Sequence, residues 1–465
     1  MTLSSSDKSS FLEGPVSRSI LRLAFPMIVA QLIHAMYNVV DRMYIGHIPG
    51  AAANALTGVG LTFPIICIVT AFTNLFGGGG APLFSISWGK GDEKRAETIM
   101  GNSFSLLLIT AVLLSAVILI FKRPLLYLFG ASDITFPYAD QYIAIYICGS
   151  VFAMSSLGMN SFINAQGFGR TGMLTVLLGA VVNIALDPLF IFVFHWGVRG
   201  AALATVISQC VSSVWAVSFL RGKKAKIKLR PAAMKIQPAL VGEIAALGSS
   251  GFIMAITNSG VQVVCNATLQ RFGGDLYVGV MTIINSIREI ATVPVSGLTS
   301  ASQPVMGYNY GAGKYRRVQS GIRFMSVAAI TVLTTVWLCL LLFPEWFIHL
   351  FNSEPELVSA CVPSMHIYFF GFFMMAGQMA GQSSAVALGR SKQAVFFSLL
   401  RKAFIVMPLT LILPRMFGLG VTGVFLAEPI SNFIGGGACY ITMLLTIWKE
   451  LKQKSAHEEA DVPVS

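Results

Sequence analysis

About twelve long apolar runs dominate this chain, and they constrain its fold more than any other feature. A helix that crosses a lipid bilayer needs roughly 20 consecutive apolar residues, which each run approaches or exceeds. Only 11% of the 465 residues are charged, too few to solvate a water-soluble protein of this size. We therefore predict an all-α membrane protein with twelve transmembrane helices. The expected spans are 18–45, 54–84, 98–121, 136–165, 171–195, 199–220, 240–270, 277–306, 320–343, 357–388, 394–416 and 420–447.

The distribution of Lys and Arg predicts that both termini lie in the cytoplasm. An inside N-terminus places 25 of the 32 basic residues, with Arg401 and Lys402 among them, in inner segments. Two more, Arg42 and Arg288, remain within spans. The outer segments hold five, namely Lys122, Arg123, Arg199, Arg271 and Arg415. The net charge of +12 thus indicates membrane topology rather than binding to nucleic acid. The polar N-terminus lacks a signal peptide's apolar core, so we expect the first span to direct insertion.

The basic stretch 221–238 predicts a cytoplasmic linker between two lobes, 1–220 and 239–450, which a polar tail at 451–465 follows. This linker would lie along the inner leaflet, where it could also contact anionic lipids. The lobes match at a nearly constant offset of 222 or 223 residues. The matching pairs are Gly89-Lys-Gly with Gly311-Ala-Gly, Leu128-Phe129 with Leu350-Phe351, Gly167 with Gly389, and Gly197 with Gly420. Because each lobe has an even number of spans, we predict two parallel six-helix repeats.

Two carboxylates within the spans of the first lobe are the strongest functional signal. A carboxylate in hydrocarbon costs at least ~2.5 kcal/mol, so Asp41 and Asp187 suggest a functional site. The helical rise places both in the outer half of the bilayer, level with Thr205. Asn183 shares a helix face with Asp187, and Ala201 shares one with Thr205. Pro188 would free nearby backbone carbonyls.

This oxygen-rich set suits H⁺ or Na⁺ and lacks the His and Cys ligands that zinc prefers. If the ion is Na⁺, its side-chain ligands would be Asp41, Asn183 and Asp187. Two close carboxylates cannot both stay ionised cheaply, so a bound cation could drive a conformational change through its differential affinity for two states. Two structural alternatives remain open. Asp187 could cap a helix broken at Pro188, and Asp41 could pair with Arg42, which otherwise reads as an interfacial side chain.

The second lobe lacks this set. The positions equivalent to Asp41, Asn183, Asp187 and Thr205 are Val263, Ile405, Leu409 and Glu428. Glu428 could contact a cationic substrate or cap a helix broken at Pro429. Arg288 and Glu289 could pair with other helices or line a cavity. The residues that could line a substrate cleft are Gln31, His34, Asn38, Asn160, Asn164, Asn258, Gln262, Arg288, Glu289, Gln378 and Gln382. Polar side chains at helical spacing more often join helices than bind ligands.

Several segments resemble the multidrug and toxic compound extrusion (MATE) family, in its MepA-like bacterial branch. They are FPMIVAQ with VVDRMYIG at 25–46, VVNIALDPLFIF at 181–192, GVRGAALATVIS at 197–208, INSIREI at 284–290 and QPVMGYNYGAG at 303–313. The resemblance covers about 14–450. It implies a V-shaped fold of two six-helix lobes, a central cleft and export driven by H⁺ or Na⁺. It also implies a cation site at Asp41, Asn183, Asp187, Thr205 and the carbonyl of Ala201.

The leading hypothesis is an antiporter that expels amphipathic, often cationic drugs or toxic metabolites from a bacterium. We expect a multi-pass, monomeric protein of the plasma membrane that contacts the lipid bilayer and needs no cofactor. The alternative is a flippase for a lipid-linked precursor, which should need a cationic cleft. A membrane-embedded enzyme is disfavoured because no metal motif, nucleophile elbow or Ser–His pairing occurs, and an ATP-driven pump because no P-loop occurs. The sequence identifies neither the substrate nor the coupling ion.

Overall fold

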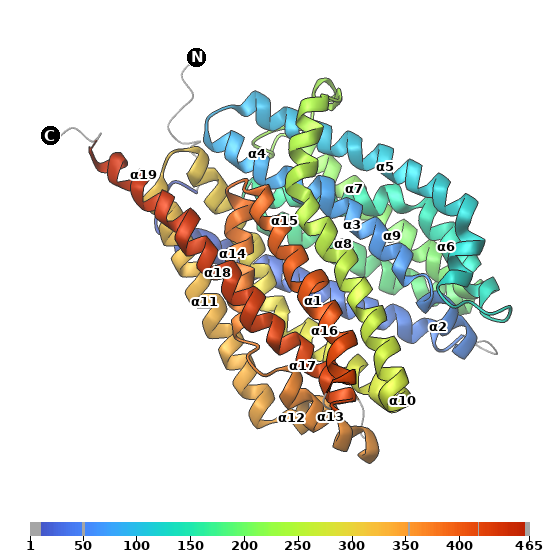
Figure 1. Cartoon of the computed structure of the whole chain (residues 1–465). Coiled ribbons are helices and arrows are strands. Elements are labelled where there is room, and N and C mark those ends of the chain that lie inside the picture. Colours follow the sequence, from blue (N-terminus) through green and yellow to red (C-terminus); the bar gives the residue numbers. More distant parts are fainter. Residues whose placement is uncertain (1–10, 49–51, 352–353, 417, 461–465) are drawn as a thin grey trace. The chain divides into compact units, whose positions relative to one another are not determined.

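The computed structural model describes residues 11–48, 52–351, 354–416 and 418–460. These residues are mostly helical, and no strand occurs among them (Figure 1). The chain forms two compact units. The N-terminal unit is Phe25–Ala255, and the C-terminal unit combines Met1–Ala24 with Ile256–Ser465. This division falls inside two helices and not in the basic stretch 221–238, so the lobe boundaries drawn from the repeat stay a prediction.

The helices up to the basic stretch follow the predicted spans, with several breaks. Pro64 lies in the first turn of α3, and α6 meets α7 at a bend of 54° next to Gly149. The elements in chain order are α1 (Val16–Ile45), α2 (Ala52–Gly60), α3 (Phe63–Thr73), the π-helical turn η1 (Asn74–Gly78), α4 (Gly79–Gly89), α5 (Glu93–Leu128), α6 (Phe136–Cys148), α7 (Ser150–Ala165), α8 (Gly169–Pro188), the π-helical turn η2 (Leu189–Val193) and α9 (Gly197–Arg221).

The rest of the chain contains more π-helical turns than the first part. After the 3₁₀ turn η3 (Pro231–Met234) come α10 (Pro238–Gly311), α11 (Tyr315–Leu342), α12 (Pro344–His349), α13 (Pro355–Tyr368), α14 (Met374–Ala387), α15 (Ser391–Leu399), the π-helical turn η4 (Leu400–Val406), α16 (Met407–Ile412), the 3₁₀ turn η5 (Leu413–Arg415), α17 (Val421–Ser431), the π-helical turn η6 (Asn432–Gly436), α18 (Gly437–Met443), the π-helical turn η7 (Leu444–Trp448) and α19 (Lys449–Ala460).

The number of membrane spans agrees with the predicted twelve once two breaks are considered. By length and composition, the described residues contain nine candidate spans, or ten if the bent pair α6 and α7 forms one span. The 74 residues of α10 are far more than one crossing needs, and Gly274 interrupts them with a non-helical backbone (φ 67°, ψ −165°). Helices α13 and α14 are separated by a turn at 369–373, so neither is long enough alone. If α10 counts as two spans, and α13 together with α14 as one, the ten spans become twelve.

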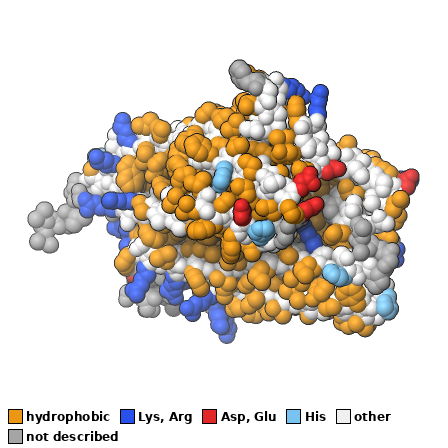
Figure 2. All heavy atoms as spheres, turned by 90° about the horizontal axis from the view of Figure 1, so that it is seen from below, with side chains coloured by type: hydrophobic (Ala, Val, Ile, Leu, Met, Phe, Trp, Pro, Cys, Tyr) orange, Lys and Arg blue, Asp and Glu red, His pale blue; other side chains and the backbone are white. Residues whose placement is uncertain are grey.

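The surface of the described residues is that of a protein solvated by lipid. Large apolar side chains are exposed on many helices, including Phe25 (71%), Ile120 (73%) and Leu128 (77%). Figure 2 shows hydrophobic side chains over much of one face. Soluble proteins rarely expose apolar surface on this scale, whereas lipid chains solvate it directly. The chain is therefore a multi-pass membrane protein.

The backbone repeats the sequence offset at its loop glycines. Gly91 and Gly313, the last residues of the two Gly-X-Gly matches, have positive φ angles of 82° and 72°. The same holds for Gly167 and Gly389 (91° and 74°) and for Gly197 and Gly420 (53° and 50°). A Cβ atom makes such angles unfavourable, so glycine suits these positions between one helix and the next. The repeat is thus visible in local geometry as well as in sequence.

Close approach of two segments in the N-terminal unit depends on a glycine at the start of α9. A Cβ atom added to Gly200 would lie 2.8 Å from the carbonyl carbon and oxygen of Phe190 in η2. Small residues let membrane helices approach closely. Ala201 and Ala204, which follow on α9, are fully buried. This contact places the first turns of α9 against the end of α8, where Asp187 lies.

The basic stretch is fixed to the N-terminal unit by the side chains of Gln166, at the end of α7, and of Asn102 in α5. The Gln166 carboxamide accepts from the backbone N–H groups of Lys226 and Ile227 and donates to the Ile227 carbonyl. The Asn102 carboxamide accepts from the backbone of Gln237 and donates to the Lys235 carbonyl. The basic stretch 221–238 is therefore an ordered segment packed on the N-terminal unit, and we call it the strap.

Candidate functional site

The predicted oxygen set of α8 and α9 comes together in the N-terminal unit. The Asn183 side-chain nitrogen lies 3.4 Å from Asp187 Oδ1 and 3.5 Å from Thr205 Oγ1. The Thr205 hydroxyl donates to the Ala201 carbonyl at 3.0 Å. Asp187, Asn183 and Ala201 are almost fully buried, and Thr205 is 8% exposed. Helical spacing within each helix and the close approach at Gly200 bring these groups together.

Asp41 on α1 joins this set. Its carboxyl lies within hydrogen-bonding reach of the Asp187 carboxyl, and both groups belong to the N-terminal unit. Two carboxyl groups can share a hydrogen bond only if one of them carries a proton. Arg42, by contrast, is exposed. Asp41 thus lies beside the second carboxyl, as the cation-site hypothesis expects.

Three buried oxygens of this set lack a hydrogen-bond donor among the described residues. They are Oδ1 of Asp41, Oδ1 of Asn183 and Oδ2 of Asp187. A buried acceptor without a donor is costly, and cations that prefer oxygen ligands relieve this cost. The donor set therefore fits a proton or Na⁺. It does not resemble a zinc site, since the described residues hold no cluster of three His, Cys, Asp or Glu side chains suited to a metal.

The end of α8 contributes a local irregularity at the site. The α-helix ends at Pro188, directly after Asp187, and continues as the π-helical turn η2. Proline has no N–H, so the turn before it loses one backbone hydrogen bond. Single π-helical turns are frequent at functional sites because they re-aim side chains and backbone groups. The irregularity thus adds backbone carbonyls to the neighbourhood of Asp187.

Tyrosine hydroxyls around the carboxyl pair are the main feature that the sequence reasoning missed. Tyr142 on α6 is 4% exposed and hydrogen bonds to Thr205. Its ring stacks on that of Tyr146, with ring centroids 6.0 Å apart. Tyr37, one helical turn before Asp41, interacts electrostatically with both aspartates. The helical spacing of Tyr37 with Asp41, and of Tyr142 with Tyr146, was the available signal.

The C-terminal unit holds a different polar cluster at the equivalent region. Glu428 on α17 pairs with Arg401 and with Lys402, whose Nζ lies 3.1 Å from both carboxylate oxygens. Arg401 also donates to Gln378 and to Asn432 Oδ1. This finding corrects the topology count above. Arg401 and Lys402 were placed with the inner-side cations, but they are buried within the span formed by α15, η4, α16 and η5.

The remaining cleft candidates divide between the two units. Asn160 and Asn164 on α7 each keep a buried side-chain oxygen without a described partner. His34 lies against Tyr37, and their side chains are 3.3 Å apart. The structure places Gln31 on α1, and Asn258 and Gln262 on the C-terminal part of α10, with Arg288 and the exposed Glu289 further along the same helix. Asn38 is also on α1, but its side chain lies outside the described ones.

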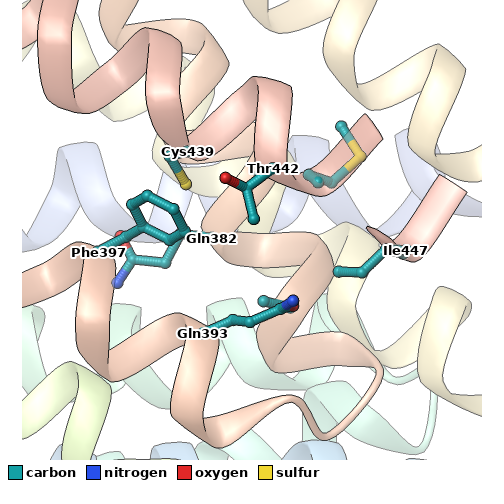
Figure 3. A pocket seen from close by; sticks show the side chains of 9 residues that line it. Gln382, Gln393, Phe397, Cys439, Thr442 and Ile447 are labelled. Carbon is teal, nitrogen blue, oxygen red and sulfur yellow. The ribbon is translucent and has the colours of Figure 1, made fainter. Parts of the chain in front are cut away.

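Gln382 lines a small pocket in the C-terminal unit, and Gln393, Phe397, Cys439, Thr442 and Ile447 surround it (Figure 3). Its amide donates to Ser398 at 2.7 Å. The pocket volume of about 10 Å³ is close to the space that one water molecule needs. It is far too small for a drug-sized molecule. This pocket alone would not hold a drug, and the role of Gln382 at a substrate cleft stays a prediction.

Comparison with known proteins identifies the family. A family model described as MatE matches residues 26–189 and 252–412. The multidrug export protein MepA of Staphylococcus haemolyticus is 22% identical over 428 residues, which cover 91% of this chain and 93% of that protein. A protein of Shewanella oneidensis described as an FAD transporter is 22% identical over 438 residues, or 93% and 96% of the two chains.

Solved structures share the fold. A crystal structure of MATE in complex with MaL6 has a TM-score of 0.89 at 21% identity and covers 97% of this chain and 100% of its own. A transporter of the MOP superfamily from Pyrococcus furiosus, described as having a binding pocket of reverse polarity, has a TM-score of 0.89 at 22% identity. It covers 96% of this chain and 100% of its own. The twelve-helix MATE fold is thereby established.

Proposed function

The chain belongs to the multidrug and toxic compound extrusion (MATE) family, and we propose that it exports amphipathic, often cationic compounds in exchange for H⁺ or Na⁺. Like the other members of its family and its MepA relatives, it is a membrane transporter and not an enzyme. The coupling to a cation and the chemical class of the substrate are the proposed parts.

One observation carries the proposed coupling. Three buried acceptor oxygens around Asp41, Asn183 and Asp187 have no described donor, within a set that contains two carboxyls and no buried basic partner for them. A cation that enters this set supplies the missing interactions. Because helices α1, α8 and α9 all contribute, its binding can favour one packing of these helices over another. The ion drives transport only to the extent that it binds the two packings with different affinity.

Side chains of the N-terminal unit have distinct expected roles in this mechanism. Asp187 and Asp41 would hold the proton or share Na⁺, and the Asn183 amide oxygen would complete the ligand set. Thr205 would keep its hydroxyl turned toward the Ala201 carbonyl, with Tyr142 holding it from the other side. Tyr142, with the ring of Tyr146 stacked on it, would shield the carboxyl pair from water. Exclusion of water strengthens the electrostatic interaction between the pair and its cation.

The setting that we propose is the bacterial plasma membrane, with a monomeric chain and both termini in the cytoplasm. The large excess of basic residues in inner segments supports this orientation even after Arg401 and Lys402 are removed from the count. Twenty-three inner cations then face five outer ones.

The experiment that tests the proposed function measures uptake of an amphipathic cation, such as ethidium, into proteoliposomes that hold the purified chain. One arm imposes a pH gradient and another imposes a Na⁺ gradient, each with ionophore controls. Uptake driven by either gradient, with counterflow of that ion, is expected. Equal uptake with and without both gradients would contradict the coupling. Because one relative is described as an FAD transporter, FAD belongs in the substrate panel.

A further inference from the structure

A buried basic cluster in the C-terminal unit has no part in the proposed cation coupling. We use this name for Arg401, Lys402, Glu428, Gln378 and Asn432. Their exposed fractions are 3%, 6%, 4%, 4% and 0%. All five belong to the same compact unit, on α14, η4, α17 and η6. The cluster is therefore enclosed within one lobe.

Two π-helical turns shape the basic cluster. Arg401 and Lys402 are consecutive in η4, yet both reach the carboxylate of Glu428. In a regular α-helix, consecutive side chains point about 100° apart. Asn432, which accepts from Arg401, is the first residue of the second turn, η6. Such turns are uncommon, and they often mark functional positions.

The basic cluster carries more positive than negative charge. Arg401 and Lys402 face one carboxylate, Glu428, and Arg288 on α10 interacts electrostatically with both Lys402 and Glu428. Three cations and one anion leave an excess of two positive charges. Glu289 also interacts with Arg288 but is exposed, and counting it still leaves one. Buried charge is costly unless it is balanced, so the excess calls for a counter-charge.

Hydrogen-bond donors in the basic cluster are also left over. Arg401 uses both terminal nitrogens, toward Gln378, Glu428 and Asn432. Its Nε is buried and has no acceptor among the described residues. The same is true of the Asn432 side-chain nitrogen and of Arg288 Nε. The N-terminal site leaves acceptors unmatched, whereas the basic cluster leaves donors unmatched.

We propose that the basic cluster is a binding site for a compact anion, which the Arg401 guanidinium and the Asn432 amide hold in the field of Lys402 and Arg288. Unmatched donors and excess positive charge are what an anion requires, and guanidinium and amide N–H groups are its usual partners. Because each residue of the cluster is at least nine-tenths buried, the ligand is small. Chloride fits this description.

A rival explanation needs no anion. Lys402 could lose its proton, which would remove one positive charge but would leave the donors of Arg401 and Asn432 unmatched. The two explanations differ in a simple way. Proton loss makes the stability of the protein independent of the anion in the buffer, whereas an anion site makes it depend on anion concentration and size.

The test is thermal unfolding of the purified full-length chain in detergent, with chloride replacing gluconate at constant Na⁺ and ionic strength. Gluconate is too bulky for an enclosed site. We expect Tm to rise with the logarithm of chloride concentration, by about 2–3 °C at a hundredfold excess of chloride over its Kd. Bromide should give an anomalous diffraction peak beside Arg401 and Asn432. An unchanged Tm together with no bromide peak would overturn the proposal.

Variants locate the effect. Lys402→Met and Arg401→Gln should each reduce the chloride-dependent rise at least fivefold, whereas Lys392→Gln, which removes an exposed charge from α15, should preserve it. A full rise in both cluster variants would place the anion elsewhere and refute the proposal. If neither variant folds, two other results test the proposal. Arg288→Gln should reduce the chloride-dependent rise in Tm, and the unmodified chain should show the bromide peak.

Discussion

Asp187 and Asp41 each have the other as a carboxyl neighbour and, among the described residues, no buried basic partner. The closest comparison in the same molecule is Glu428, which has two basic partners. The Asp41–Asp187 pair can therefore bind a cation, whereas the charge of Glu428 is already balanced by Arg401 and Lys402. This contrast, rather than burial alone, separates a candidate coupling residue from a structural one.

The Tyr142 hydroxyl supports the site through Thr205. Tyr142→Phe removes this hydrogen bond while keeping the ring stacked on Tyr146. A neutral hydrogen bond is worth about 0.5–1.5 kcal/mol, so we expect a two- to tenfold loss of apparent cation affinity. The measurement is the ion concentration that gives half-maximal transport. Tyr138→Phe, one turn away on the same helix, is the matched control. Equal affinities in both variants would remove Tyr142 from the site.

Residue identity alone predicted the carboxyl, amide and hydroxyl groups of the site, because polar side chains are conspicuous in apolar runs. It did not predict the tyrosines, because aromatic residues are common throughout membrane helices and the helical spacing of Tyr37 with Asp41 did not stand out among them. It also misplaced Arg401 and Lys402. Near the end of a span, basic residues usually reach the interface, and only the partner Glu428, 26 residues further on, holds Lys402 inside.

At the scale of helices, the contact between η2 and α9 decides whether the site forms. Gly200→Val would drive a side chain into the backbone of Phe190, which lies 2.8 Å from the added Cβ. We expect a loss of about 1–3 kcal/mol in stability and a weaker cation response, because α9 carries Ala201 and Thr205. Tm and ion dependence of transport measure the two effects.

Gly242→Val on α10 is the control for this substitution, since an added Cβ there meets nothing within 4 Å. Wild-type Tm in Gly200→Val would show that α9 does not need this close approach.

The strap at 221–238 is held mainly by side-chain carboxamides. Gln166→Ala deletes three hydrogen bonds to the backbone of Lys226 and Ile227. We expect trypsin to cut the strap about fivefold faster or more. The lost hydrogen bonds lower the free energy of local opening, so the cleavable open form is more populated. Gels of the digested protein should show two fragments, one from each half. Gln237→Ala, whose side chain is exposed, should cut at the unmodified rate. Unchanged cutting of Gln166→Ala would mean that other contacts fix the strap.

The sequence predicted the helices well where apolar runs were long, and poorly where they were interrupted. The run at 357–388 is one predicted span, but its backbone turns at 369–373 between α13 and α14. The π-helical turns η4 and η6 had no visible signal, because one inserted residue changes a helix without changing its composition. Glycines at fixed offsets were the reliable markers, since their positive φ angles depend on a single residue type.

For the whole molecule, orientation in the membrane is the property that basic residues determine. We expect a tag after Ser465 to be cleaved by protease only when the cytoplasmic side is accessible. Inside-out vesicles and intact cells provide the two sides, and a tag inserted after Ser132, on an expected outer loop, provides the reverse pattern. Cleavage of the C-terminal tag in intact cells would contradict the predicted topology.

The two units have opposite polar chemistry on the same repeated helical frame. Unmatched acceptors in the first half favour a cation, and unmatched donors in the second half favour an anion. The equivalent helices were therefore retained while their buried side chains diverged. The central claim is that the carboxyl pair of the first half couples an ion gradient to export.

The most direct measurement is the initial rate of gradient-driven uptake in proteoliposomes for Asp187→Asn, compared with Asp133→Asn at an exposed loop position. Asparagine keeps the shape of Asp187 but cannot bind and release a proton or offer Na⁺ a charge. We expect at least a tenfold loss of the gradient-driven rate, equivalent to about 1.4 kcal/mol, with ethidium binding retained. Asp133→Asn should match the unmodified chain. A gradient-driven rate in Asp187→Asn equal to that of the unmodified chain would contradict the account.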